Sequence, residues 1–301
     1  MKSHQGGVAL VLVLWVITLL TVIAANFAFS MRGEAHITRN LLFAAQAQAQ
    51  ADGGVWRAVY ELLKPPGDAQ RWQGNGLVHQ LNTAEAELLI SILDESGKID
   101  LNAAPEDLLK GLFLSVGIGQ EAAVSLADAI VDWRDPDKLK RLHGAEETEY
   151  RAAGKEYVPS NAPFETLDEL QRVMGMTPEL YRKLAQSLTV YSRQQSVNAL
   201  VAPREVLLAI PGIGPALVEQ YVAQRQSQLL ANQRVAPLAF SSVFINSSSL
   251  LRTFTVRSEA KMSDGTVFVR QSVVRMPPDA GRPFIVLAWG EGGSEPMMEL
   301  R

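Results

Sequence analysis

The sequence contains no cysteine, and its charges are nearly balanced at a formal net charge of −4. The chain therefore has no disulfide bonds, no thiol nucleophile and no cysteine metal ligands. A small negative charge provides no broad attraction for nucleic acid. Only four histidines occur, and no G-x-S-x-G, Walker or H-E-x-x-H pattern accompanies them. A non-enzymatic protein is expected, with a membrane-anchored hydrolase as a weaker alternative that lacks a recognisable triad.

Charge is also missing from Val8 to Met31, where no side chain is ionisable. This run reaches the roughly 20 residues that a helix needs to cross a ~30 Å hydrocarbon core. A cleavable secretory signal has a shorter apolar stretch of about 7–15 residues and a polar break after it. Here helix-compatible sequence continues, which predicts a membrane anchor. Because seven preceding residues cannot hold a folded domain, we expect the C-terminal body to lie in the periplasm or outside the cell.

Apolar residues recur at helical spacing beyond the anchor, with polar residues between them. The pattern predicts one helix from about Val8 to Lys64, which Pro65 ends. An anchor followed by a separate helix, broken at Gly53-Gly54, is the alternative. The apolar face of the second half is expected to consist of Ile37, Leu41, Leu42, Ala45, Ala49, Trp56, Val59, Leu62 and Leu63.

Strand patterns occur on both sides of a long helical region. Strands are predicted around Leu77–Leu81 and Glu87–Leu93, in a hairpin that turns at Asp264-Gly265, and in "RPFIVLAWG". From about Gly97 to Ser241 the chain is predicted to be almost wholly helical. The expected fold class is α+β, with an all-helical lobe inserted into a small β-sheet.

The helical region is internally similar. "LNAAPEDLLKGLFLSVGIG" aligns with "VNALVAPREVLLAIPGIG", and "ETLDELQRVMGMTPELY" is a fainter third copy. Each predicts a helix, a glycine turn and a second helix, the helix-hairpin-helix pattern. The turn glycines are Gly117, Gly119, Gly175, Gly212 and Gly214.

Glycine turns of this kind present backbone N–H groups to phosphates in nucleic-acid-binding proteins. The stretch from Asp94 to Val190, however, has 18 acidic against 11 basic residues. Phosphate binding needs a positive surface, so a structural joint between helices is favoured. The second copy has Arg204 and Arg225, but also Glu205 and Glu219. A membrane-tethered DNA-uptake or DNA-binding protein that uses the hairpin at Pro211–Pro215 stays open as the alternative.

An acidic stretch, "DAIVDWRDPDKLKRLHGAEETEYR", surrounds a short loop. Its acids suit Ca²⁺, which takes six to eight oxygen ligands in irregular geometry. The spacing is not that of an EF-hand, and the basic residues of 138–141 offer ion pairs instead of a metal. The acids are Asp135, Asp137, Glu146, Glu147 and Glu149.

Taken together, these motifs resemble the family of general secretion pathway protein K, the large minor pseudopilin of type II secretion. "GGVALVLVLWVITLL" is similar to a prepilin leader. "DESGKIDLNAAPEDLL", "ADAIVDWRDPD", "GAEETEY", "NAPFETLDELQRVMGMTPELY" and "LLAIPGIG" are similar to successive motifs of the family. The resemblance extends from the leader to about residue 275.

The resemblance implies a pilin-like fold: a long N-terminal helix against an antiparallel sheet, interrupted by an all-α domain with helix-hairpin-helix or SAM-like repeats. It implies prepilin-peptidase cleavage between Gly7 and Val8, a methylated new N-terminus, and a single-pass bacterial inner-membrane protein with a periplasmic body. Major pilins have glutamate at the fifth mature position, where this chain has Leu12. A carboxylate without a partner is costly in lipid, so a subunit with no neighbour above it can dispense with that residue.

The resemblance also implies partners and a metal. The protein is expected to cap the tip of the periplasmic pseudopilus, with minor pseudopilins I and J packed on its helix around residues 41–49. The other expected partners are the major pseudopilin and prepilin peptidase, and no nucleic acid is expected. Structural calcium is implied at Asp135, Asp137, Glu146 and Glu147, although aspartate is commoner at the last position.

Five segments are expected along the chain. They are a leader at 1–7, a transmembrane helix at 8–30, and a periplasmic helix with the first strands at 31–96. An inserted helical domain follows at 97–240, in two subdomains of about 97–190 and 196–240. The last strands and a tail occupy 241–301.

Overall fold

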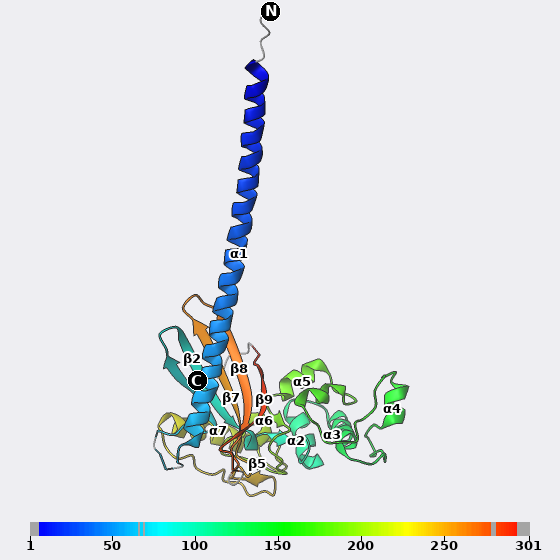
Figure 1. The fold of residues 1–301 in the computed structure, drawn as a ribbon. Helices are drawn as coiled ribbons and strands as arrows, with labels where there is room; N and C mark the ends of the chain where they lie inside the picture. Colours follow the sequence, from blue (N-terminus) through cyan, green and yellow to red (C-terminus); the bar gives the residue numbers. More distant parts are fainter. Residues whose placement is uncertain (1–5, 66, 69, 278–280, 294–301) are drawn as a thin grey trace, which may run out of the picture.

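The computed structural model describes residues 6–65, 67–68, 70–277 and 281–293. Its most extended element is α1, Gly6–Leu63, a helix of 58 residues and about 87 Å at 1.5 Å per residue. Figure 1 shows its first half projecting alone from the folded body. The predicted single helix is confirmed, and the alternative of a break at Gly53-Gly54 is wrong.

The body contains a five-stranded antiparallel sheet in the order β1-β2-β7-β8-β9. All the predicted strands are confirmed. Asp264 accepts a hydrogen bond from the Thr266 N–H (2.9 Å) in the β7–β8 turn, and Gly265 has φ +90° there, a conformation that glycine adopts without steric cost. The bounds are β1 Asn75–Asn82, β2 Ala86–Asp94, β7 Thr253–Met262, β8 Val267–Arg275 and β9 Ile285–Glu291.

Strands β2 and β7 are neighbours in the sheet although a long segment, called the lobe here, separates them in the chain. The lobe lies beside the sheet near the C-terminal end of α1 (Figure 1). Its helices are α2 Glu106–Ser115, α3 Gln120–Arg134, α4 Glu147–Ala152, α5 Pro178–Leu184, α6 Arg204–Leu208 and α7 Pro215–Leu230, with short 3₁₀ turns at Glu95–Gly97 and Leu167–Arg172.

The lobe is not all-helical, which corrects the expectation from the sequence. Strand β3 (Ile99–Asp100) pairs in parallel with β4 (Leu188–Thr189), and β5 (Val197–Asn198) pairs in parallel with β6 (Ile245–Asn246). Strands of two residues are too short to show alternation of apolar and polar side chains, so the sequence pattern could not predict them.

Two separate hydrophobic cores stabilise the body. One lies inside the lobe and includes Leu112, Phe113 and Tyr150. The other lies between the second half of α1 and the sheet and includes Val55, Ile90 and Val256. The domain boundaries given above stay a prediction, but the sheet and the lobe each bury their own apolar side chains.

Helix α1 contacts the sheet through a face of small residues. Val59 and Leu62 belong to this face, as expected, whereas Leu41 and Leu42 are exposed. The other buried residues are Ala47, Ala51, Val55 and Ala58. The sequence pattern missed the alanines because their small side chains give a weak hydrophobic signal.

Gly54 lies where the helix comes nearest to the sheet. A Cβ atom at this position would be 2.1 Å from Ser258 Oγ on β7 and 3.2 Å from Ile90 Cδ1 on β2. Real Cβ atoms do not approach other atoms so closely, so only glycine fits. Gly53, its neighbour, has no atom within 4 Å of such a Cβ.

A polar and aromatic contact fixes the helix beside this point. Arg270 of β8, whose side chain is 8% exposed, forms an ion pair with Asp52 of α1. The Arg270 guanidinium also lies over the rings of Phe268 (5.0 Å) and Trp289 (5.3 Å). Trp289 in turn stacks on Trp56 of α1, with 5.2 Å between ring centroids. These contacts set the rotation of the helix against the sheet.

The substitution Gly54→Ala should destabilise the folded body, because its Cβ overlaps Ser258. We expect a loss of about 1–3 kcal/mol in the free energy of unfolding, measured by denaturant titration of the full chain in detergent micelles. The matched control Gly53→Ala should gain up to about 1 kcal/mol, since alanine favours the helix. Adding Ser258→Ala to Gly54→Ala should recover part of the loss; equal stability of the two alanine variants would contradict this packing.

Candidate functional site

The acidic stretch forms a loop between α3 and α4. Asp135 directly follows α3 as its C-cap, Asp137 lies in the loop, and Glu146 is the N-cap of α4. Glu147 is the first residue of α4. The loop therefore places three of the four predicted ligands at its two ends.

Two further aspartates, Asp128 and Asp132 of α3, hold this loop. Asp132 is fully buried and accepts hydrogen bonds from the Arg141 N–H at 3.2 and 3.3 Å. Asp128 accepts one from the His143 N–H at 3.0 Å. A Cβ at Gly144 would be 2.0 Å from Asp132 Oδ2, so the loop lies directly against this carboxylate. The sequence analysis missed both residues; their signal is the four-residue spacing of acids on an otherwise apolar helix.

The carboxylates of this loop, together with Asp132, influence one another electrostatically. Burial, together with Asp135 and Asp128, raises the pKa of Asp132 to about 6 despite hydrogen bonds from the loop backbone. Burial and the charge of Asp137 raise the pKa of Asp135. Burial raises the pKa of Glu146, helped by Asp132 and by the acids at 135 and 137. Negative charge is thus concentrated where water is partly excluded.

Some oxygens here have no hydrogen-bond donor. Asp135 Oδ1, Glu146 Oε1 and Asn161 Oδ1 are buried without a partner in the described structure. Asn161 belongs to the same region, because its Nδ2 donates to the Asp137 carbonyl at 2.9 Å. Within the described ranges, no three histidine or acidic side chains are gathered in a geometry that would hold a metal ion. The loop thus presents unpaired oxygens but not a complete set of ligands.

Ion pairs account for the remaining acids. Glu147 binds Arg151, one turn along α4, at 2.7 Å. Lys140 binds Glu149 at 2.8 Å. Arg141 binds Glu106 of α2 at 2.7 Å. Lys140 and Arg141 therefore form ion pairs, but not with Asp135 or Glu146.

The internal similarity seen in the sequence has a structural counterpart in two arginines. Arg134 of α3 donates hydrogen bonds to the carbonyls of Leu101 and, at 2.8 Å, Ala104. Arg225 of α7 donates to the carbonyls of Ala199 (3.0 Å) and Ala202 (2.7 Å). In both copies the carbonyls lie four and one residues before the proline that precedes the first helix.

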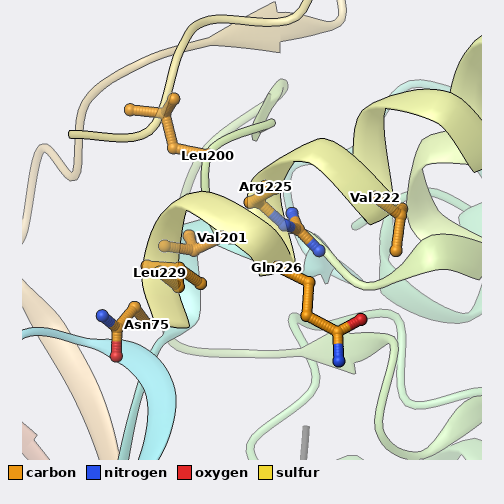
Figure 2. A pocket seen from close by; sticks show the side chains of 7 residues that line it. All are labelled: Asn75, Leu200, Val201, Val222, Arg225, Gln226 and Leu229. Carbon is orange, nitrogen blue, oxygen red and sulfur yellow. The ribbon is translucent and has the colours of Figure 1, made fainter. Parts of the chain in front are cut away.

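The two arginines considered for phosphate binding, Arg225 and Arg204, both have partners within the protein. Burial lowers the pKa of Arg225, which borders a small cavity of about 50 Å³ with Val201 and Leu229 (Figure 2). Arg204 forms ion pairs with Glu219 and Glu205. No specific observation therefore favours the DNA-binding alternative.

The projecting half of α1 is the second candidate site. By length and composition it can cross a membrane, and its apolar side chains from Leu10 onward are exposed. Leu12, at the position of the pilin glutamate, is 62% exposed. Gly7 and Val8 lie in the α1 backbone, but their side chains and residues 1–5 lie outside the description.

The chain is similar to known secretion proteins over most of its length. Residues 75–193 match the family model of type II secretion system (T2SS) protein K. Proteins of that name from Klebsiella pneumoniae (27% identity, 85% of this chain and 83% of the relative) and Pseudomonas aeruginosa (26%, 88% and 87%) are similar to it. These matches support an assignment to type II secretion system protein K, to which the chain is similar along most of its length.

A solved structure has the same fold. It is the crystal structure of the GspK-GspI-GspJ complex of the enterotoxigenic Escherichia coli type 2 secretion system. The similarity has a TM-score of 0.60 at 20% identity and covers 88% of this chain and 99% of the other. The exposed apolar half of α1 and the mixed helix-and-sheet body agree with the minor pseudopilin role that these matches support.

The contacts of Arg134 and Arg225 should be structural. Arg225→Gln removes two charge-assisted hydrogen bonds and leaves two carbonyls short of a donor, which we expect to cost about 2–4 kcal/mol of unfolding free energy. The readout is denaturant unfolding of the full chain in micelles. Arg182→Gln, at an exposed arginine that binds Glu179 at 3.5 Å, is the control and should change stability little. Unchanged stability of Arg225→Gln together with lost affinity for duplex DNA would instead indicate a nucleic-acid site.

Proposed function

We propose that this protein is a non-enzymatic minor pseudopilin that caps the tip of the periplasmic pseudopilus and supports export of folded proteins across the outer membrane. The observation that carries the proposal is the continuity of α1. One helix has an exposed apolar half and a half packed on the sheet, in a chain similar to type II secretion system protein K. The apolar half serves as anchor and as packing surface for other subunits.

The N-terminus fits this role. Prepilin peptidase cleaves between Gly7 and Val8, and the new N-terminus is methylated. The anchor then crosses the bacterial inner membrane once, with the body in the periplasm. The major pseudopilin meets the same helix below the tip.

Minor pseudopilins I and J are the proposed partners at the tip. The similar solved structure is a complex of GspK with GspI and GspJ. On this chain the face of α1 that bears Leu41, Leu42, Ala45 and Ala49 is exposed, while the opposite face, including Ala47 and Ala51, is buried on the sheet. The exposed face therefore remains available for a neighbouring helix.

Two features favour the topmost position. The lobe extends sideways from the body at the end of α1 remote from the N-terminus (Figure 1), where a subunit stacked above would meet it. Leu12 has no carboxylate to pair with the N-terminal amine of such a subunit. We further propose that the paired helices with Gly117 and Gly212 turns are helix-hairpin-helix or SAM-like units that act as joints inside the lobe.

The soluble part without residues 1 to about 30 should form a 1:1:1 complex with the soluble parts of pseudopilins I and J, measured by light scattering. Leu41→Glu with Leu42→Glu should weaken assembly at least tenfold, because two charges enter an apolar interface. Leu142→Glu, at an exposed leucine of the lobe, is the control and should assemble normally. Free monomers only, or filaments of this chain alone, would contradict the tip position.

We also propose that the loop between α3 and α4 binds structural calcium. Oxygens without donors at Asp135, Glu146 and Asn161 fit a cation, and Asp132 and Asp137 add negative charge beside them. The ion supplies positive charge that relieves the mutual repulsion of these carboxylates. Glu147 does not fit as a ligand in this arrangement, since it pairs with Arg151.

Calcium should raise the unfolding temperature of the full chain relative to chelator, and magnesium should do so less, because it demands a regular octahedral site. Asp135→Asn should remove most of the shift by deleting charge from an unpaired oxygen site. Glu147→Gln is the matched control and should keep the shift. A shift that survives Asp135→Asn but is lost in Glu147→Gln would reverse the assignment of these two residues.

A further inference from the structure

A cavity of about 380 Å³ lies where α1, the sheet and the lobe meet. Leu62 of α1, Trp72 of the following loop, Phe254 of β7 and Val201 of the lobe contribute apolar walls. A Cβ at Gly74 would be 2.8 Å from the Phe254 ring, so glycine lets the loop lie close to this wall. The cavity therefore borders the core between α1 and the sheet, and Val201 adds a wall from the lobe.

Two arginines, Arg71 and Arg252, also line the cavity. Arg71 Nη2 donates to the Leu62 carbonyl at 3.1 Å. Arg71 Nε is buried and has no acceptor in the described structure. Both arginines line the same cavity, and burial, together with the charge of Arg252, lowers the pKa of Arg71. Among the described residues neither arginine is within ion-pair distance of an acid.

The acids that line the cavity have other donors. Asp94 Oδ1 accepts hydrogen bonds from the Ser96 N–H and the Ser249 hydroxyl, both at 2.9 Å. Asp68 Oδ1 accepts one from the Gln70 N–H at 2.8 Å. Two like charges and an unpaired buried donor thus line one cavity.

The chemistry of the cavity walls indicates what kind of ligand can bind there. A guanidinium presents parallel N–H donors that match the two oxygens of a carboxylate. Desolvated donors of this kind bind an anion more strongly than donors in water, because the local dielectric is low. Leu62, Trp72 and Phe254 add apolar surface that a bare inorganic anion would not use. A carboxylate attached to an apolar or aromatic group fits both parts.

We propose that this cavity binds a carboxylate carried on a small apolar or aromatic group, held by Arg71 and Arg252. The ligand is either a free organic acid or the C-terminal carboxylate of a peptide with an apolar last residue. Because the walls come from the helix, the sheet and the lobe, the bound ligand contacts all three. This site goes beyond the pseudopilin role and does not depend on it.

The test is calorimetric titration of the full chain in micelles with phenylacetate and with the dipeptide acetyl-Leu-Phe bearing a free carboxylate. Saturable binding of at least one acid is expected, with no binding of the uncharged analogues, phenylethanol and the dipeptide amide. Binding of both acids supports a cavity open to free organic acids. Binding of the dipeptide alone supports a peptide terminus, and binding of phenylacetate alone supports a free acid.

Variants assign the binding to the cavity. Arg71→Gln and Arg252→Asn should each weaken it at least tenfold; asparagine is chosen because Arg252 has φ +45°, a conformation that asparagine tolerates. Arg182→Gln, remote from the cavity, should bind like the natural chain. Unfolding curves for each variant distinguish lost binding from lost folding, and Arg252→Asn leaves the Arg71 bond to Leu62 intact. No saturable binding of either acid, or binding equal in a folded Arg252→Asn chain, would overturn the proposal.

Discussion

The structure depends on how closely α1 approaches the sheet. At Gly54 the helix backbone lies so near Ser258 that no side chain fits between them, and small alanines extend the contact on both sides. Close packing of this kind gains dispersion contacts with many sheet atoms at once. It also allows no sliding, because Asp52 and Trp56 must meet Arg270 and Trp289 at the same time. The rotation of the buried half is thereby fixed.

Because the rotation of the buried half of α1 is fixed, the directions of the helix faces in the projecting half are fixed as well. Because α1 is continuous, the faces of its membrane-spanning part keep a set direction relative to the sheet and lobe. A kink at Gly53-Gly54 would have uncoupled the two halves. Instead the side chains of the second turn lie on a defined face about 60 Å away along the axis, at 1.5 Å per residue. A subunit in an ordered fibre needs this relation between its helix and its body.

The lobe shows the limits of inference from sequence most clearly. The long helix and the sheet strands were predictable because their periods repeat over many residues. The pairs β3–β4 and β5–β6 were not, since two residues carry no period and their partners lie far along the chain. At the acidic loop, Asp132 was missed because its role is to accept from the Arg141 backbone, nine residues away, which no side-chain spacing records. Glu147 was expected as a ligand, but an ion pair with Arg151 accounts for its carboxylate, and the calcium assignment stays a proposal.

The polar residues between β2 and the lobe explain how two separate cores behave as one body. Thr255 of β7 donates to Glu95, which also binds Lys98, both at 2.6–2.7 Å. Asp100 is fully buried and accepts hydrogen bonds from the Ser192 hydroxyl and the Arg193 N–H. It thereby ties the start of the lobe to the segment between β4 and β5. Buried carboxylates with several donors are costly to separate, because each freed group loses its partners away from water. The contact between the sheet and the lobe therefore consists of hydrogen bonds and ion pairs, which need a set geometry, whereas the cores on either side are apolar. Because this contact needs a set geometry, it holds the lobe at one angle to the sheet. The lobe is thereby also held at one angle to α1, the helix that enters the membrane.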